Sequence, residues 1–247
     1  MITAAERPGA GMAVAASWSG GKDGCLALHQ AMQMGYAVKG LLNFVSPAQR
    51  RSCFHGIPNE LMALQASLIG LPLLQHAVGD LATYECEFRR AAEILKERNI
   101  EGIVFGDIYL DGGENWVERV CADVGLEAIE PLWQREPAAI MEEFIGAGFR
   151  AVVVSAKADL FDRGLVGRMV DHELVREIAA RGACPCGERG EFHTLVVDGP
   201  LFRGGAIEIT ESRAVLIEGF WPHWSLDILG WRIRESGTLR PAPAPAP

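Results

Sequence analysis

The first half of the chain alternates short apolar runs with segments of helical periodicity, and this alternation limits the possible folds more than any other feature. Each apolar run is short enough to form a buried strand. Strands separated by helices imply crossover connections and a parallel sheet with helices on both faces. The expected strands are 12–18, 38–44, 71–77, 102–105 and 126–129, and the expected helices follow residue 24 and cover 59–69, 84–97 and 115–124.

The second half of the chain has a different pattern. Helical periodicity at 137–147 and 171–181 flanks a strong apolar run at 151–155, and strand-like runs dominate after residue 190. This change predicts a second, smaller α+β subdomain that begins near Trp133. Its late strands are expected at 192–197, 206–209 and 213–218.

Composition narrows the class of protein. Hydrophobic residues make up 49% of the 247 residues, which excludes a wholly disordered chain. The six cysteines are scattered and do not resemble a disulfide framework. Residues 1–11 lack the apolar core of a signal peptide. No apolar run reaches the length of about 18 residues that a membrane span needs. We therefore expect a cytoplasmic protein with reduced thiols, a flexible extension at 1–11 and a disordered Pro/Ala tail at 236–247.

The charge balance argues against a nucleic-acid partner. The chain has 23 basic and 32 acidic residues and a formal charge of −9, whereas nucleic-acid binding normally needs a basic face. The net charge does not exclude a local basic pocket. The basic residues are mostly arginine, and the four lysines are Lys22, Lys39, Lys96 and Lys157.

The richest motif is Ser-Trp-Ser-Gly-Gly-Lys-Asp-Gly at 17–24, between the first expected strand and the first expected helix. Glycines let the backbone approach a ligand closely, and a helix start adds positive partial charge. Lysine adds a full charge and serine a hydroxyl, so we predict a polyphosphate site; a plain surface turn is the alternative. The spacing is not that of a Walker A loop. The residues expected to bind are Ser17, Ser19, Gly20, Gly21, Lys22, Asp23 and Gly24.

The string Ser-Gly-Gly-Lys-Asp after a first strand resembles the PP-loop of the N-type ATP pyrophosphatases, which split ATP into AMP and pyrophosphate. Further blocks stand in the order that is typical of the diphthine–ammonia ligase family, over residues 13–203. These blocks are His55-Gly56-Ile57-Pro58 with 61–65 and 71–73, Gly106-Asp107-Ile108, Pro131-Leu132-Trp133 with Arg135, Gly167-Arg168 with Asp171, and Cys-Gly-Glu-Arg-Gly-Glu-Phe-His-Thr at 186–194 followed by 198–200.

The resemblance implies a Rossmann-like α/β fold of the adenine nucleotide alpha hydrolase-like type, with an ATP-binding domain at 12–132 and a substrate-binding subdomain at 133–235. It also implies a ligase that adenylates a carboxylate, releases pyrophosphate and passes the acyl group to ammonia with release of AMP. ATP and Mg²⁺ are the expected cofactors. The expected partners are ammonia and a carboxylate on a small molecule or a modified residue. No membrane partner is expected. A homodimer is compatible with the sequence.

The resemblance assigns roles to individual residues. Lys22, Asp23, Glu188 and Glu191 are the expected catalytic residues: Lys22 neutralises phosphate charge, and the glutamates orient ammonium, accept a proton or bind metal. Asp23 and Asp107 are expected to hold Mg²⁺, which prefers one or two carboxylates plus phosphate oxygens. Nucleotide contacts are expected of His55, Gly106 and Asp107. Substrate contacts are expected of Arg135, Arg168, Glu188, Glu191, His193 and Thr194. The alternatives are that the aspartate belongs to a turn, the glutamates to a solvated acidic loop and the arginines to the surface, and that the histidines are structural.

Two residues depart from the family pattern. The PP-loop usually closes with serine, and Gly24 stands there instead, which removes a hydroxyl contact worth about 1 kcal/mol. His193 stands where the diphthamide-forming members usually have an acidic residue, and this form resembles the bacterial branch. Because bacteria have no diphthamide, we expect an acceptor other than diphthine.

Two other functions stay open. Gly24 is compatible with a nucleotide-binding sensor that has weak or no catalysis. Cys184 and Cys186 suggest a tRNA-thiolating PP-loop enzyme, although their C-x-C spacing is not that of common zinc sites. The tryptophans at 221, 224 and 231 could stack on a planar ligand or pack a subdomain or dimer surface.

Overall fold

The computed structural model describes residues 9–109, 115–218 and 221–235. The Pro/Ala tail expected at 236–247 and residues 1–8 of the expected extension lie outside this part of the chain. The described residues belong to two compact units. Unit 1 comprises residues up to Ser19, Asp23–Cys53 and Leu71–Gln134, and unit 2 comprises Gly20–Lys22, Phe54–Gly70 and the residues from Arg135 onward.

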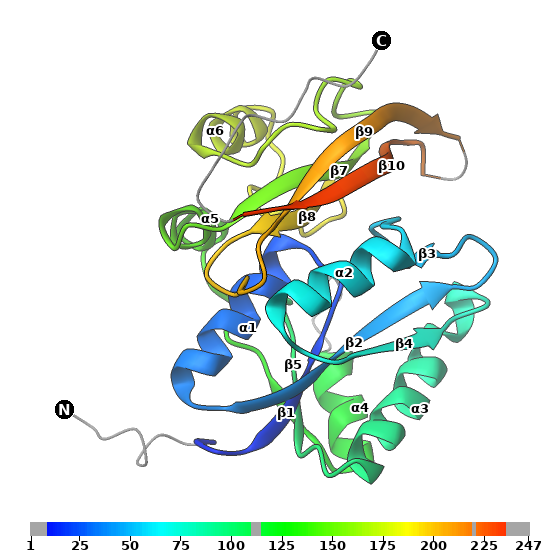
Figure 1. Ribbon diagram of the computed structural model, residues 1–247, viewed down its shortest axis with the longest axis vertical. Coiled ribbons are helices and arrows are strands. Elements are labelled where there is room, and N and C mark those ends of the chain that lie inside the picture. Colours follow the sequence, from blue (N-terminus) through cyan, green and yellow to red (C-terminus); the bar gives the residue numbers. More distant parts are fainter. Residues whose placement is uncertain (1–8, 110–114, 219–220, 236–247) are drawn as a thin grey trace. The chain divides into compact units, whose positions relative to one another are not determined.

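Unit 1 is built on a mostly parallel sheet (Figure 1). The strand order is β3-β2-β1-β5-β6, with β4 also paired to β2. Only β3 runs antiparallel to its neighbour. The expected Rossmann-like α/β class is confirmed. The strands are β1 (Ala13–Ser17), β2 (Ala37–Ser46), β3 (Arg51–Ser52), β4 (Leu73–Ala77), β5 (Gly102–Val104) and β6 (Glu127–Ile129).

Helices flank this sheet because its two main crossovers step in opposite directions. The first crossover runs from β1 through α1 to the neighbouring strand β2. The second runs from β4 through α3 to β5, which lies on the opposite side of β1. Right-handed crossovers of opposite direction place α1 and α3 on opposite faces. The strand order therefore reverses between β1 and β5, where such sheets bind ligands. The helices are α1 (Lys22–Met34), α3 (Tyr84–Glu97) with the short turn η2 (Leu81–Thr83) before it, and α4 (Trp116–Val124).

The hydrophobic core of unit 1 follows the alternation of its strands. Ala15, Leu42 and Phe105 pack with the apolar sides of α3 and α4 in one buried cluster. The neighbours Val14 and Ala16 are also fully buried. Because successive strand residues point to opposite faces, both faces of the sheet are covered.

Unit 2 is built on an antiparallel sheet in the order β8-β7-β10-β9 (Figure 1). The central strand β7 has the pattern Arg-Ala-Val-Val-Val-Ser-Ala-Lys, and six consecutive residues of it are buried. The expected α+β character is confirmed. The elements are α2 (Asn59–Ile69), α5 (Pro137–Gly146), β7 (Arg150–Lys157), α6 (His172–Ala180), β8 (Phe192–Asp198), β9 (Ala206–Ile217) and β10 (His223–Arg234).

Two expectations for the late strands were wrong. The runs 206–209 and 213–218 are one strand, β9, because the polar residues between them continue the pairing with β10, as in Glu211 opposite Gly230 and Ser212 opposite Ile228. Strand β10 itself was not predicted, and it contains Trp224 and Trp231. A long exposed ribbon tolerates polar residues within its strands, which hides it from a hydrophobicity pattern.

None of the helices in the described ranges is both long and apolar enough to cross a membrane. The expected domain boundaries remain predictions. By its contacts, unit 2 includes two early segments, Gly20–Lys22 and Phe54–Gly70, in addition to the residues after Gln134.

Candidate functional site

Lys22 is the centre of a group of contacts in unit 2. Its side chain is 3% exposed, and its Nζ donates a hydrogen bond to the main-chain oxygen of Cys186. Its main-chain N–H donates to Oγ1 of Thr194 at 3.1 Å, and its Nζ lies 5.0 Å from the centre of the Phe192 ring. The expected phosphate-binding lysine is therefore held by the 186–194 signature, which the sequence could not indicate.

The glycines of the loop are in contact with the same strand. The main-chain oxygen of Gly20 accepts hydrogen bonds from the N–H of Val196 at 2.9 Å and from Nε2 of Gln65 at 3.0 Å. A side chain at Gly21 would place its Cβ 2.6 Å from Cε1 of His55. Glycine therefore suits position 21, because any side chain there would force the His55 ring to move.

His55 and His193 form a pair of rings with centroids 4.5 Å apart. Nδ1 of His55 donates to the main-chain oxygen of Thr194 at 3.0 Å, which leaves Nε2 as the lone-pair nitrogen of the neutral ring. Burial and the charge of Lys22 lower the pKa of His55 to about 4, although the hydrogen bond to Thr194 acts in the opposite direction. Burial, followed by the charges of His55 and other basic groups, holds the pKa of His193 well below its usual value.

Glu191 closes the loop that carries the Cys186 carbonyl. One carboxylate oxygen accepts the N–H of Cys184 and the other accepts the N–H of Arg189, each at 2.9 Å, and the residue is 3% exposed. Both oxygens thus bind main chain within residues 184–191. This geometry favours a positioning role over the proton-accepting role expected from the sequence. Glu188 lies in the same loop and is partly exposed.

In unit 1, the residues after β1 and β5 are in direct contact. A side chain at Gly106 would place its Cβ 2.6 Å from the main-chain nitrogen of Gly24 and 2.7 Å from the carbonyl carbon of Asp23. Asn43 of β2 fixes the start of the loop, because its Nδ2 donates to the main-chain oxygen of Trp18 at 2.8 Å, between Ser17 and Ser19. These loops lie at the reversal of strand order, as expected for a ligand site.

Acidic side chains gather at the same strand ends. Burial and the charge of Asp23 raise the pKa of Asp107 to about 6. Glu130, which follows β6, also has a raised pKa, caused by burial and by the charge of Asp107. Its carboxylate accepts a hydrogen bond from Nδ2 of Asn115 at 2.7 Å.

A divalent cation fits this pair of aspartates, because it would relieve the repulsion between them. Within the described ranges, no three or more His, Cys, Asp and Glu side chains are grouped so that they could hold a metal ion by themselves. An ion at Asp23 and Asp107 would therefore need further oxygens from phosphate or water. This is the usual coordination of Mg²⁺ in nucleotide enzymes.

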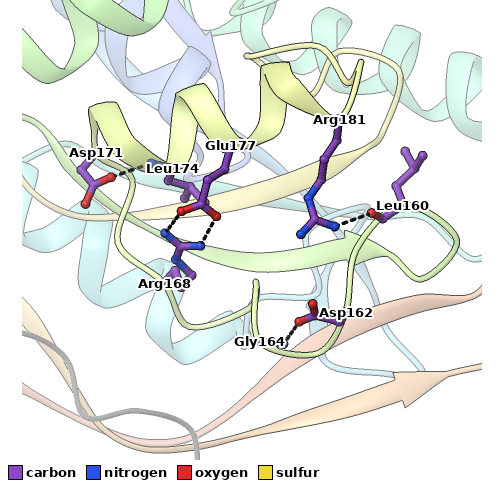
Figure 2. Close-up of polar contacts among 8 residues, drawn as sticks. All are labelled: Leu160, Asp162, Gly164, Arg168, Asp171, Leu174, Glu177 and Arg181. Carbon is purple, nitrogen blue, oxygen red and sulfur yellow. Dashed lines mark hydrogen bonds and ion pairs between the residues drawn. The ribbon is translucent and has the colours of Figure 1, made fainter.

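The two arginines expected to bind substrate are engaged elsewhere in unit 2. Figure 2 shows the guanidinium of Arg168 bound by both oxygens of Glu177 on α6, at 2.6 and 2.9 Å. Nη2 of Arg135 donates to Glu143 on α5 at 2.6 Å. In the described part of the chain, neither arginine contacts the Lys22 group. A sequence with many arginines does not show which of them have a partner.

Three positions bear on the alternative functions. Cys184 and Cys186 are 4% and 1% exposed, and the thiol of Cys186 donates to the main-chain oxygen of Pro137 at 3.3 Å. All six cysteines are free thiols. At Gly24, an added Cβ would meet only the Ser17 oxygen, at 3.7 Å, so a side chain fits there.

Sequence reasoning missed the roles of several residues. The Cys186 carbonyl and the Phe192 ring hold Lys22, and Gln65 joins the loop to β8. Gln65 belongs to the family block at 61–65, which does not indicate its contacts, and a main-chain carbonyl leaves no trace in a sequence. Glu130 could have been found, because it directly follows a predicted strand.

Comparisons with known proteins show which family this chain resembles. The family model described as diphthamide synthase N-terminal domain matches residues 12–128, and the model described as diphthamide synthase C-terminal domain matches residues 136–224. A diphthine–ammonia ligase of Danio rerio is 27% identical over 229 residues, covering 83% of this chain and 89% of the relative. That of Mus musculus is 29% identical over 231 residues, covering 83% and 85%. A solved structure, described as a predicted subunit of tRNA methyltransferase from Methanocaldococcus jannaschii, aligns with a TM-score of 0.45 at 16% identity over 76% of this chain and 98% of its own.

Proposed function

Because this chain belongs to the diphthine–ammonia ligase family within the PP-loop superfamily, and is thus an ATP-dependent carbon–nitrogen ligase, we propose that it joins ammonia to a carboxylate through an acyl-adenylate. A carboxylate oxygen attacks the α-phosphorus of ATP, and the bond from that phosphorus to pyrophosphate breaks. The nitrogen of ammonia then attacks the acyl carbon. The amide forms, AMP leaves and one proton is released.

The observation that carries this proposal is the burial of Lys22 against the signature strand. Its Nζ binds a main-chain carbonyl, which keeps the full charge of the ammonium near the loop. A fixed cation at the start of a helix stabilises the negative charge that develops on departing pyrophosphate. The loop residues Ser17, Ser19, Gly20, Gly21 and Gly24, together with Gly106, would place the phosphates.

Asp23 and Asp107 would hold Mg²⁺, which supplies charge neutralisation at the phosphates. His55, whose tautomer is set by Thr194, presents Nε2 as an acceptor toward the nucleotide or the amine. His193 would contact the acceptor, as would Thr194 and Glu188. Glu191 acts through the loop it closes.

The acceptor in this proposal is a carboxylate other than diphthine, because His193 gives the signature the form of the bacterial branch. The reaction takes place in the cytoplasm with free ammonia. A reducing compartment suits six cysteines that form no disulfide, two of which lie in the loop that carries the signature.

Exchange of labelled pyrophosphate into ATP tests the proposal. The exchange should depend on an added carboxylate from a panel of small acids, and Lys22→Met should abolish it. Lys39→Met is the matched control, because it removes an exposed lysine from β2. Binding of ATP without any exchange, under all carboxylates tried, would instead favour the nucleotide-sensor function that Gly24 suggests. The tRNA-thiolating alternative is not favoured, because Cys184 and Cys186 are both buried.

A further inference from the structure

Three basic side chains project from one face of the sheet of unit 2. In the strand register, His223 of β10 pairs with Lys157 of β7, and His193 of β8 pairs with Ser155 of β7. Residues 155 and 157 lie two apart on the same strand, and paired residues share a face. We call Lys157, His193 and His223 the basic face.

Among the described residues, Lys157 and His223 are held by main-chain oxygens and not by carboxylates. Nζ of Lys157 donates to the main-chain oxygen of Arg189 at 2.7 Å, and in the described part of the chain Lys157 makes no ion pair. The ring of His193 stacks on His55 and has no hydrogen-bond partner among the described residues. His223 contacts the main-chain oxygen of Trp221 through Nδ1 at 3.0 Å.

One acidic residue on the same face, Asp227, is already bound by an arginine. Asp227 lies on β10 four residues after His223, on the same face, and Arg213 of β9 binds its carboxylate at 3.0 and 3.1 Å. The charges that act on His193 are those of basic groups, among them Lys22, Lys157 and His223. Among the described residues, the basic face thus holds one lysine and two histidine rings, and none of the three is paired with a carboxylate.

An exposed aromatic side chain adjoins Lys157. The ring of Trp221 is 69% exposed and lies 5.8 Å from Nζ of Lys157. A cation beside an exposed aromatic ring suits a ligand with an anionic group next to an apolar body.

We propose that the basic face binds the carboxylate acceptor as an anion, with Trp221 against the apolar part of the same molecule. A carboxylate must be brought close to the phosphates of ATP, which repel it, so a separate cation such as Lys157, with polar side chains beside it, is needed to hold it. This inference rests on the proposed function for the identity of the ligand as the acceptor. The presence of an anion site on the basic face is testable without any activity.

Malonate, a small dicarboxylate, is the probe. The full-length protein, labelled with ¹⁵N in its histidine rings, is titrated with malonate at constant ionic strength. The titration is done with and without saturating α,β-methylene ATP and Mg²⁺, which occupy the phosphate loop without turnover. The ring signals of His193 and His223 should shift in a saturable way under both conditions, whereas those of His29, His76 and His172 should not shift.

Lys157→Met should weaken malonate binding by about tenfold, the effect of one charge-assisted hydrogen bond, and Lys39→Met should leave it unchanged. Since Lys157 also holds the Arg189 carbonyl, His223→Gln provides a second variant that leaves that contact in place, and it should weaken binding too.

Three results would overturn the inference: no saturable shift of His193 and His223, equal weakening by Lys39→Met, or displacement of malonate by the ATP analogue. Failure of the proposed function has a different signature. In that case the ATP analogue leaves all ring signals unchanged and no pyrophosphate exchange occurs, while malonate still binds to the basic face.

Discussion

The main-chain N–H of Lys22 donates to Oγ1 of Thr194 at 3.1 Å and so joins the start of α1 to β8 across 172 positions of sequence. The first N–H groups of a helix have no partner within the helix, and a side-chain oxygen commonly supplies one. Here the oxygen comes from a distant strand. Residues 20–22 therefore depend on the signature block for their conformation.

Thr194→Val should destabilise the protein by about 1–3 kcal/mol, because it leaves the buried N–H of Lys22 without an acceptor. Urea unfolding measures the loss. Thr194→Ser keeps the hydroxyl and serves as the control, with a much smaller effect expected. Equal stability of Thr194→Val and the unmodified protein would show that the hydrogen bond is not needed.

Glu191→Gln should lower both stability and ATP use. The amide replaces one of two acceptor oxygens, so an N–H of Cys184 or Arg189 loses its partner, at about 1–3 kcal/mol. The loop then no longer presents the Cys186 carbonyl to Lys22. Thermal unfolding and pyrophosphate exchange are measured together, and Glu188→Gln in the same loop is the control for the loss of stability alone. Lost turnover at unchanged stability would favour the proton-accepting role for Glu191.

Gly106→Ala should disrupt the contact between the loops after β1 and β5. The new Cβ would lie 2.6 Å from the main-chain nitrogen of Gly24, and backbone must shift to admit it. We expect a destabilisation of about 1–3 kcal/mol and weaker ATP binding, measured by unfolding and by calorimetry.

Gly24→Ser is the contrasting change at the same contact. Its Cβ would meet the Ser17 oxygen at 3.7 Å, an ordinary contact, so the fold should be retained. The added hydroxyl should keep or raise the rate of pyrophosphate exchange. A misfolded Gly24→Ser protein would contradict this view of the loop.

Stability should fall as the pH is lowered from about 6.5, the ordinary histidine pKa, toward the folded pKa of His55 of about 4. In this range His55 takes up a proton in the unfolded chain but not in the folded protein. This proton uptake lowers the free energy of the unfolded state relative to the folded state. The contribution of neutral His55 to the free energy of unfolding is complete above a pH of about 6.5 and is lost below a pH of about 4. The free energy of unfolding against pH measures the slope, and His55→Gln should flatten it. An NMR titration that places the His55 pKa near its ordinary value would contradict the assignment.

The elements that were predicted best are those with strong local signals. The helix at 59–69 and that at 84–97 have the predicted bounds. Asn115, expected as the first residue of a helix, is the N-cap of α4, and its side chain accepts the N–H of Glu118. The expectation for 206–218 failed because the pairing of β9 with β10, and not its own hydropathy, holds it extended.

The sequence by itself determined that this chain has a parallel sheet with a glycine-rich loop after its first strand, and which family it resembles, because periodicity, glycine spacing and short motifs are local properties. Only the tertiary structure decided that Cys186, Phe192 and Thr194 hold Lys22, that Glu191 binds main chain, and that Arg168 is paired with Glu177. Those contacts depend on which strands pair and where a side chain finds an acceptor. A hydrogen bond between residues far apart in sequence is created by packing, and no pattern along the chain specifies it.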